Sequence, residues 1–170
     1  MNVISNTTVI SNFAATGQLE VLRALYGHVF ISTDVYAEIQ EGLDEGYAFY
    51  GEVTNAVAPP NATGWIRLTG LQTEAELRYL GTLPRRLHKG ETSCLAIAKV
   101  RDWLLLTDDM AVRQEAHRLQ IRLSGSLGCL VLAVERELCT LDMANTWLSD
   151  MLQQGYRSPV ADLTPLMQVK

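Results

Sequence analysis

Acidic and amide side chains come at the ends of segments that have the pattern of buried strands. Asp108 and Asp109 directly follow the apolar segment 102–107, and Asn6 follows a short apolar segment at the start of the chain. In an open parallel sheet, ligands bind beyond the carboxyl ends of the strands, near the point where the strand order reverses. These side chains are therefore candidates for one shared site.

Two glutamates and a serine are expected at the same edge. Glu38 lies one turn into the helix predicted after the second strand, Glu91 opens the helix before segment 102–107, and Ser126 opens the helix after the last strand. Carboxylates held close together raise each other's pKa unless a cation lies among them. Oxygen ligands with open water positions suit Mg²⁺ or Mn²⁺ rather than zinc. Such a site can activate water and stabilise charge on a phosphodiester, so the pattern predicts metal-assisted phosphodiester hydrolysis.

Each of these residues also has a purely structural explanation. Glu91 can complement the dipole of the helix that it opens, and Asp108 or Asp109 can cap the next helix, as Ser126 can cap its own. Glu38 can be a solvated helix residue, and an asparagine after a strand is often a turn residue because its side chain bonds nearby backbone. Only the set taken together favours a site.

Arg85, Arg86 and Lys89 come shortly before Glu91. They would place positive charge beside the acidic residues, an arrangement that suits the backbone of a nucleic acid approaching a metal site. The alternative is a solvated loop. Arg113 can belong to the same patch or to ordinary surface.

Short apolar segments alternate with amphipathic ones along the chain, which predicts β-α-β crossovers and a mostly parallel sheet covered on both faces. The expected fold is a three-layer α/β/α sandwich. Predicted strands are 1–5, 29–31, 65–69, 102–107 and 121–124. Predicted helices are 9–15, 16–26, a helix from Thr33 to about Leu43, 74–80, 91–100, 110–119, 126–138 and 142–154.

The length of 170 residues predicts one domain over 1–170, with a core of about 1–140 and a C-terminal helix at 142–154. Segment 42–64 holds four glycines and two adjacent prolines. We expect it to be mostly irregular or partly helical, and excursions of this kind are usually functional or mobile. The tail from Pro159 onward is predicted to be extended or frayed.

Composition narrows the class of protein. Hydrophobic residues make up 48% and charged residues 19%, which is globular rather than disordered. The net charge of −5 excludes a bulk polyanion binder, so binding of a nucleic acid would depend on a local basic patch. Cys94, Cys129 and Cys139 lack metal-type spacing and are predicted to be buried free thiols in helices. No signal peptide or membrane-length apolar run is evident, so we expect a cytoplasmic protein with no membrane partner.

Five short motifs occur in a recognisable order: Ser5-Asn6-Thr7-Thr8, Val35-Tyr36-Ala37-Glu38-Ile39, Gly90-Glu91-Thr92-Ser93, Leu105-Leu106-Thr107-Asp108-Asp109 and Gly125-Ser126-Leu127-Gly128. The ordered set, over roughly residues 3–135, resembles the PIN-like family. Within it, the chain is similar to the small prokaryotic branch related to the VapC-type toxins of toxin–antitoxin pairs.

This resemblance implies a ribonuclease that depends on Mg²⁺ or Mn²⁺, with RNA as substrate. The implied metal ligands are Asn6, Glu38, Glu91, Asp109 and the adjacent Asp108, with Glu38, Glu91 and Asp109 also catalytic. Ser126 and Thr7 are expected to support the site, and Arg85, Arg86, Lys89 and Arg113 to bind RNA. A cognate antitoxin and a homodimer are the implied protein partners.

Asn6 departs from the family pattern, because the family usually has an aspartate there. An asparagine oxygen can ligate a hard cation but supplies no charge, so metal affinity should be lower. Either the protein is a nuclease with a weaker site or an altered ion preference, or it is a degenerate module that binds RNA or a protein without cutting. Asp108 can compensate in the first case.

A response-regulator receiver is the remaining alternative, because an Asp-Asp pair follows a predicted strand. Receivers place that pair after the first strand and need a lysine late in the chain. Here the pair follows a late strand, and the only lysines are Lys89, Lys99 and Lys170. The sequence disfavours this class.

Overall fold

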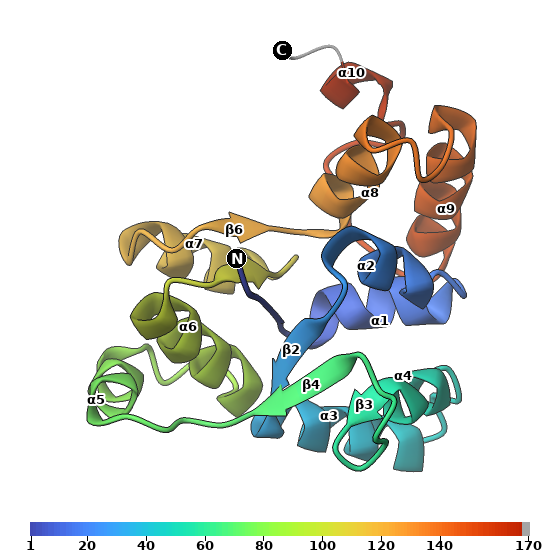
Figure 1. The fold of residues 1–170 in the computed structure, drawn as a ribbon. Helices are drawn as coiled ribbons and strands as arrows, with labels where there is room; N and C mark the ends of the chain where they lie inside the picture. Colours follow the sequence, from blue (N-terminus) through green and yellow to red (C-terminus); the bar gives the residue numbers. More distant parts are fainter. Residues whose placement is uncertain (168–170) are drawn as a thin grey trace.

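A six-stranded, all-parallel sheet forms the centre of the computed structural model, which describes residues 1–167 (Figure 1). The strand order is β3-β4-β2-β1-β5-β6. The strands are β1 (Val3–Ser5), β2 (Val29–Ser32), β3 (Val57–Ala58), β4 (Ile66–Thr69), β5 (Leu104–Leu106) and β6 (Leu123–Ser124). The predicted α/β/α fold with a parallel sheet is confirmed.

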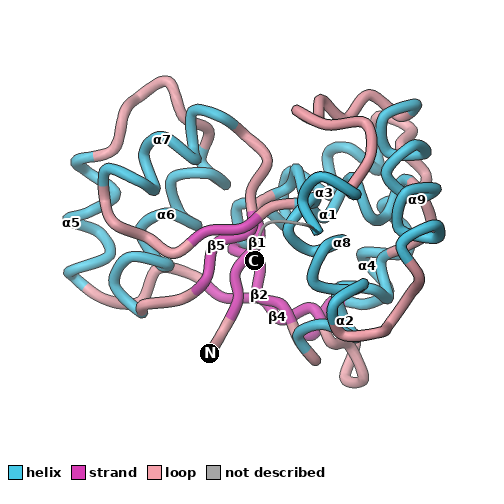
Figure 2. Tube along the Cα trace, turned by 90° about the horizontal axis from the view of Figure 1, so that it is seen from above, coloured by secondary structure: helices cyan, strands magenta, loops and turns pink. Residues whose placement is uncertain are grey.

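Helices cover both faces of the sheet (Figure 2). They are α1 (Thr7–Ala15), α2 (Leu19–Tyr26), α3 (Thr33–Asp44), α4 (Tyr50–Ala56), α5 (Glu74–Thr82), α6 (Lys89–Arg101), α7 (Met110–Arg118), α8 (Ser126–Glu135), α9 (Leu141–Gln153) and α10 (Thr164–Met167). In both views α5, α6 and α7 gather on one side, and α1, α2, α8 and α9 on the other. Helix α3 packs against α4, α6 and α1.

The strand order reverses beside β1. This strand pairs with β2 on one side and with β5 on the other, where Ile4 is in register with Leu105 and Ser5 with Leu106. All three residues of β1 are buried, which explains why Val3 and Ile4 are both apolar without alternation. The carboxyl ends of β1 and β5 therefore form the switch point at which the candidate residues were expected.

Segment 42–64 is partly helical, as expected, because α3 reaches Asp44 and α4 follows. Gly42 is required by packing, since a Cβ there would lie 2.5 Å from Cε2 of Tyr50. Strand β3 was not anticipated. Two residues at the edge of the sheet are too short to give a periodic signal.

The prediction for the C-terminal tail is wrong at residues 164–167, which form α10. Leu163 is fully buried, and its backbone N–H donates to Oδ1 of Asn145 at 2.8 Å. The carboxylate of Asp162 accepts a hydrogen bond from the N–H of Thr164 at 2.7 Å, which favours a helix start. Tertiary contacts thus fix this segment, while residues 168–170 lie outside the described part of the chain.

Two smaller corrections concern the region between α8 and α9. Helix α8 ends at Glu135 rather than at Leu138, which is exposed. Cys94 and Cys129 are buried in helices as predicted, but Cys139 is half-buried in the turn between these helices. Within residues 1–167, no helix combines the length and apolarity that a membrane span needs.

A buried ion pair ties α5 to α6. Nε of Arg101 donates to Oε1 of the fully buried Glu76 at 2.6 Å, and its other nitrogens donate to Thr69 and Gly70. Burial acts to raise the pKa of Glu76, but the hydrogen bonds from Arg101 and from two backbone N–H groups outweigh it. The pKa of Glu76 is therefore lowered overall.

Replacing Arg101 with alanine should destabilise the fold by about 3 kcal/mol at pH 7, because a buried carboxylate loses its cation. Glu76 contributes stability above its unfolded pKa of about 4.3, and this contribution is lost as pH falls through the lower folded pKa. The deficit of the variant should therefore shrink at pH 4. Urea unfolding at both pH values measures this, with Arg78→Ala, which breaks an exposed pair with Glu74, as the control. An equal deficit at both pH values would contradict the assignment.

Candidate functional site

A pocket of about 260 Å³ opens at the carboxyl ends of the central strands. It is lined by Asn6, Thr7, Thr8, Glu38, His88 and Glu91. Four of the predicted site residues are thus brought together: Asn6 follows β1, and Thr7, Glu38 and Glu91 belong to α1, α3 and α6. We call this the acidic pocket.

Asn6 is buried and uses both ends of its amide group within the protein. Oδ1 accepts hydrogen bonds from the N–H and the hydroxyl of Thr8, at 3.2 and 2.7 Å, and so caps α1. Nδ2 donates to Oγ1 of Thr107 at 2.8 Å, joining the ends of β1 and β5. The first acidic position of the motif is therefore a neutral helix cap.

Glu38 is held by one hydrogen bond at each carboxylate oxygen. The hydroxyl of Thr7 donates to Oε2, and the backbone N–H of Gly90 donates to Oε1 at 3.2 Å. A Cβ at position 90 would lie 2.5 Å from Oε1 of Glu38, so glycine allows the close approach. The carboxylate lies against the first turn of α6, where the helix dipole favours negative charge.

Glu91 faces the same pocket from the first turn of α6. Its Oε2 accepts a hydrogen bond from the backbone N–H of His88 at 2.9 Å. Burial raises the pKa of Glu91, and the carboxylates of Asp109 and Glu38 raise it further, against the hydrogen bond from His88. The negative charges of Asp109 and of Glu38 thus each act on Glu91, which is the condition that favours a bound cation beside it.

Asp109 caps α7, since its Oδ1 accepts from the N–H of Val112 at 2.9 Å. It lines a second, larger pocket of about 830 Å³ that adjoins the acidic pocket, and Thr7 and Thr8 line both. We call this second cavity the groove. Asp109 thus lies at the junction between the two and interacts electrostatically with Glu91.

Asp108 faces the groove and does not line the acidic pocket. Its Oδ1 accepts from the N–H of Ser126 at 2.8 Å, and its Oδ2 accepts from the hydroxyl of Ser126 at 2.5 Å and from Nδ2 of Asn12 at 2.9 Å. Gly125 leaves room for this contact, because a Cβ there would lie 2.5 Å from Oδ1. Asp108 and Ser126, predicted as ligand and support, together anchor α8 and α1 to the end of β5.

A family model described as a PIN domain matches residues 2–168. The chain belongs to the PIN domain family. The predicted family is therefore confirmed, whereas its toxin branch is not tested by this match. PIN domains are generally nucleases and generally use divalent metal ions. No curated protein gave a significant match to this chain.

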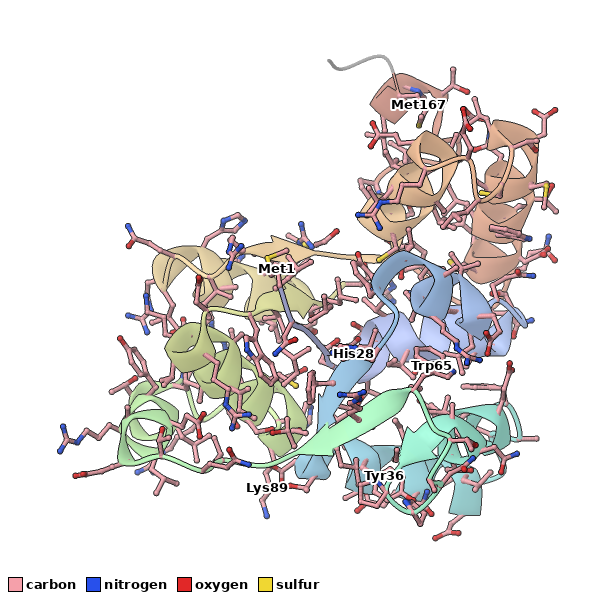
Figure 3. All side chains as sticks on the ribbon, viewed as in Figure 1. Met1, His28, Tyr36, Trp65, Lys89 and Met167 are labelled. Carbon is pink, nitrogen blue, oxygen red and sulfur yellow. The ribbon has the colours of Figure 1, made fainter. Side chains whose placement is uncertain are left out.

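The basic residues of this PIN domain fall into two places. Arg85, Arg86 and Lys89 are exposed around the start of α6, next in sequence to residues that line the acidic pocket. Figure 3 shows Lys89 projecting outward from this end of the molecule. Arg113 instead lines the groove, where its Nη1 donates to the carbonyl of Thr107 at 3.0 Å. The four basic residues predicted to bind RNA therefore do not form one continuous patch: three lie at the start of α6, and Arg113 lies in the groove.

The acidic pocket has the chemistry that a hard divalent cation needs, because carboxylate and hydroxyl oxygens line it. Glu38 and Glu91 are the two carboxylates that share the pocket and would hold the ion. No group of three or more acidic, histidine or cysteine side chains within residues 1–167 is arranged to bind a metal as it stands. The oxygen ligands of the pocket thus fit a divalent cation. The third carboxylate, Asp109, uses its Oδ1 to cap α7.

Sequence reasoning missed Tyr156 and Arg157, which line the groove from the segment that follows α9. They lie outside every motif, and only the return of the chain past α1 brings them to the site. Asn12 was also missed, although it lies one helical turn after Thr8 and so on the same face of α1.

Proposed function

We propose that this PIN domain is a toxin-type endoribonuclease that depends on Mg²⁺ or Mn²⁺ and hydrolyses RNA phosphodiesters with a metal-activated water. The observation that supports this most is the convergence of Glu38 and Glu91 on one pocket, with Asp109 close enough to raise the pKa of Glu91. Uncompensated negative charge beside exposed basic residues suits a cation and a phosphate backbone.

The metal ion supplies Lewis acidity and lowers the pKa of a bound water. Around it, the residues of the chain have separate tasks. Thr7 and the N–H of Gly90 fix the orientation of the Glu38 carboxylate. The N–H of His88 does the same for Glu91. Arg85, Arg86 and Lys89 attract the RNA backbone toward the pocket, and Asp109 adds the third negative charge at its edge.

Replacing Asn6 with aspartate should raise the affinity for Mn²⁺ by about tenfold or more, because ligand charge tunes the affinity of such sites. Aspartate caps a helix as well as asparagine does, so the start of α1 should persist. Isothermal titration calorimetry measures the affinity. The rise of the melting temperature at saturating Mn²⁺ should also be larger in the variant.

Asn6→Ser is the matched control, because serine also caps a helix but adds no charge. It should bind Mn²⁺ no more tightly than the native protein. Equal affinity in Asn6→Asp and the native chain would argue against position 6 as part of the metal site.

One observation favours a second function. Both ends of the Asn6 amide are occupied by Thr8 and Thr107, so this position offers neither a charge nor a free donor atom. A module that binds RNA or a protein without cutting is compatible with such a site. Cleavage by Asn6→Asp but not by the native protein would support this alternative.

A toxin-type function also implies a cytoplasmic location and a cognate antitoxin, and we include a homodimer among the proposed assemblies. These partners follow from the family resemblance. Light scattering of the purified protein tests the homodimer, and co-expression with the products of neighbouring reading frames tests the antitoxin.

A further inference from the structure

The groove adjoins the acidic pocket, and the two share the wall formed by Thr7 and Thr8. Its volume of about 830 Å³ lies in the range of about 300–1,000 Å³ that is typical of sites for small ligands. Anything that crosses the acidic pocket as an extended strand can therefore continue into the groove past the start of α1.

Two arginines on the wall of the groove have no carboxylate partner. Arg113 and Arg157 form no ion pair within residues 1–167. Nη1 of Arg113 donates to the carbonyl oxygens of Thr107 and Ser124, and within residues 1–167 its Nε and Nη2 have no hydrogen-bond acceptor. Two carboxylates, Asp108 and Asp109, also line the groove, and both already accept hydrogen bonds from neutral donors within the protein. The open N–H groups of the two arginines suit a phosphate, which accepts charge-assisted hydrogen bonds.

Tyr156, which precedes Arg157 in the chain, supplies an aromatic side chain to the groove. It is half-buried, and its hydroxyl lies 3.5 Å from Oδ1 of Asp108 and donates to it. The ring forms part of the wall of the groove. An aromatic ring beside arginines is the combination that binds single-stranded nucleic acids, because bases stack on the ring while the cations hold phosphates.

We propose that the groove is a subsite for a nucleotide of single-stranded RNA that flanks the bond cut in the acidic pocket. Arg113 and Arg157 hold its phosphate, and its base stacks on Tyr156. The inference rests on the proposed function for the identity of the strand, but it concerns binding and does not require cleavage.

The test is the salt dependence of RNA binding in EDTA, measured by fluorescence anisotropy with a labelled single-stranded hexaribonucleotide. Each lost phosphate contact should reduce the slope of log K against log salt by about 0.7 for a single strand. We expect Arg157→Ala to show this reduction. Arg78→Ala removes the same charge from exposed α5 and should leave the slope unchanged.

A second pair of variants tests stacking. Tyr156→Leu should weaken binding by at least about fivefold without changing the slope, whereas Tyr156→Phe keeps the ring and should bind like the native protein. Equal losses in both variants, or an unchanged slope in Arg157→Ala, would overturn the subsite. Failure of the nuclease proposal looks different: binding would respond to these variants as described while no RNA is cut with any metal.

Discussion

Replacing Asp109 with asparagine is expected to lower metal-dependent RNA cleavage by at least about 100-fold and to leave stability almost unchanged. The carboxylate lies close enough to Glu91 to raise its pKa, so its charge belongs to the acidic site. Its Oδ1 also caps α7, and asparagine caps a helix equally well. The variant thus removes the charge and keeps the cap. A loss of about 2.7 kcal/mol in transition-state stabilisation corresponds to the 100-fold effect.

Urea unfolding of Asp109→Asn is the control for this result. A midpoint close to that of the native protein, together with lost cleavage, would assign the effect to chemistry. Cleavage within a few-fold of native would mean that Asp109 acts only as a cap.

Replacing Asp108 with alanine is expected to destabilise the protein by about 3 kcal/mol. The change leaves the N–H and hydroxyl of Ser126 without their acceptor, and the amide of Asn12 keeps only its weaker acceptor, Oγ of Ser126. Buried donors without a partner cost about 1–3 kcal/mol each, and part of that cost is relieved where water enters from the groove. The midpoint of urea unfolding measures the loss.

The matched control is Glu20→Ala, which removes an exposed carboxylate that forms a surface ion pair with Arg23. It should change stability by no more than about 1 kcal/mol. Asp108→Ala with nearly native stability but weakened Mn²⁺ binding would contradict the anchoring role and restore Asp108 as a ligand.

The neighbours Asp108 and Asp109 show where sequence reasoning stops. The strand-end rule places both at the right edge of the sheet, because residues 103–106 are continuously apolar and predict a buried strand. Successive side chains of extended backbone point to opposite sides. One carboxylate therefore turns toward α8 and the other toward α7, and the sequence alone did not tell which would face Glu91.

The fold was predictable where burial on both faces produced continuous apolar segments, as at β1 and β5. It was not predictable where tertiary contacts decide a short segment. Leu163 and Asn145 fix the C-terminal turn before α10, and the pairing with β4 creates the two-residue β3. The same reason hid Tyr156 and Arg157, which reach the groove only because the chain returns past α1 after α9.

The most direct test of the central claim is cleavage of a mixed RNA pool by the purified protein with Mn²⁺, with Mg²⁺ and with EDTA, beside Asp109→Asn prepared in the same way. We expect cleavage by the native protein with a divalent cation, none with EDTA, and at least a 100-fold loss in Asp109→Asn. Cleavage that persists in EDTA or in Asp109→Asn would contradict the acidic pocket as the catalytic site. No cleavage by the native protein under any condition would contradict the nuclease itself and favour the binding module.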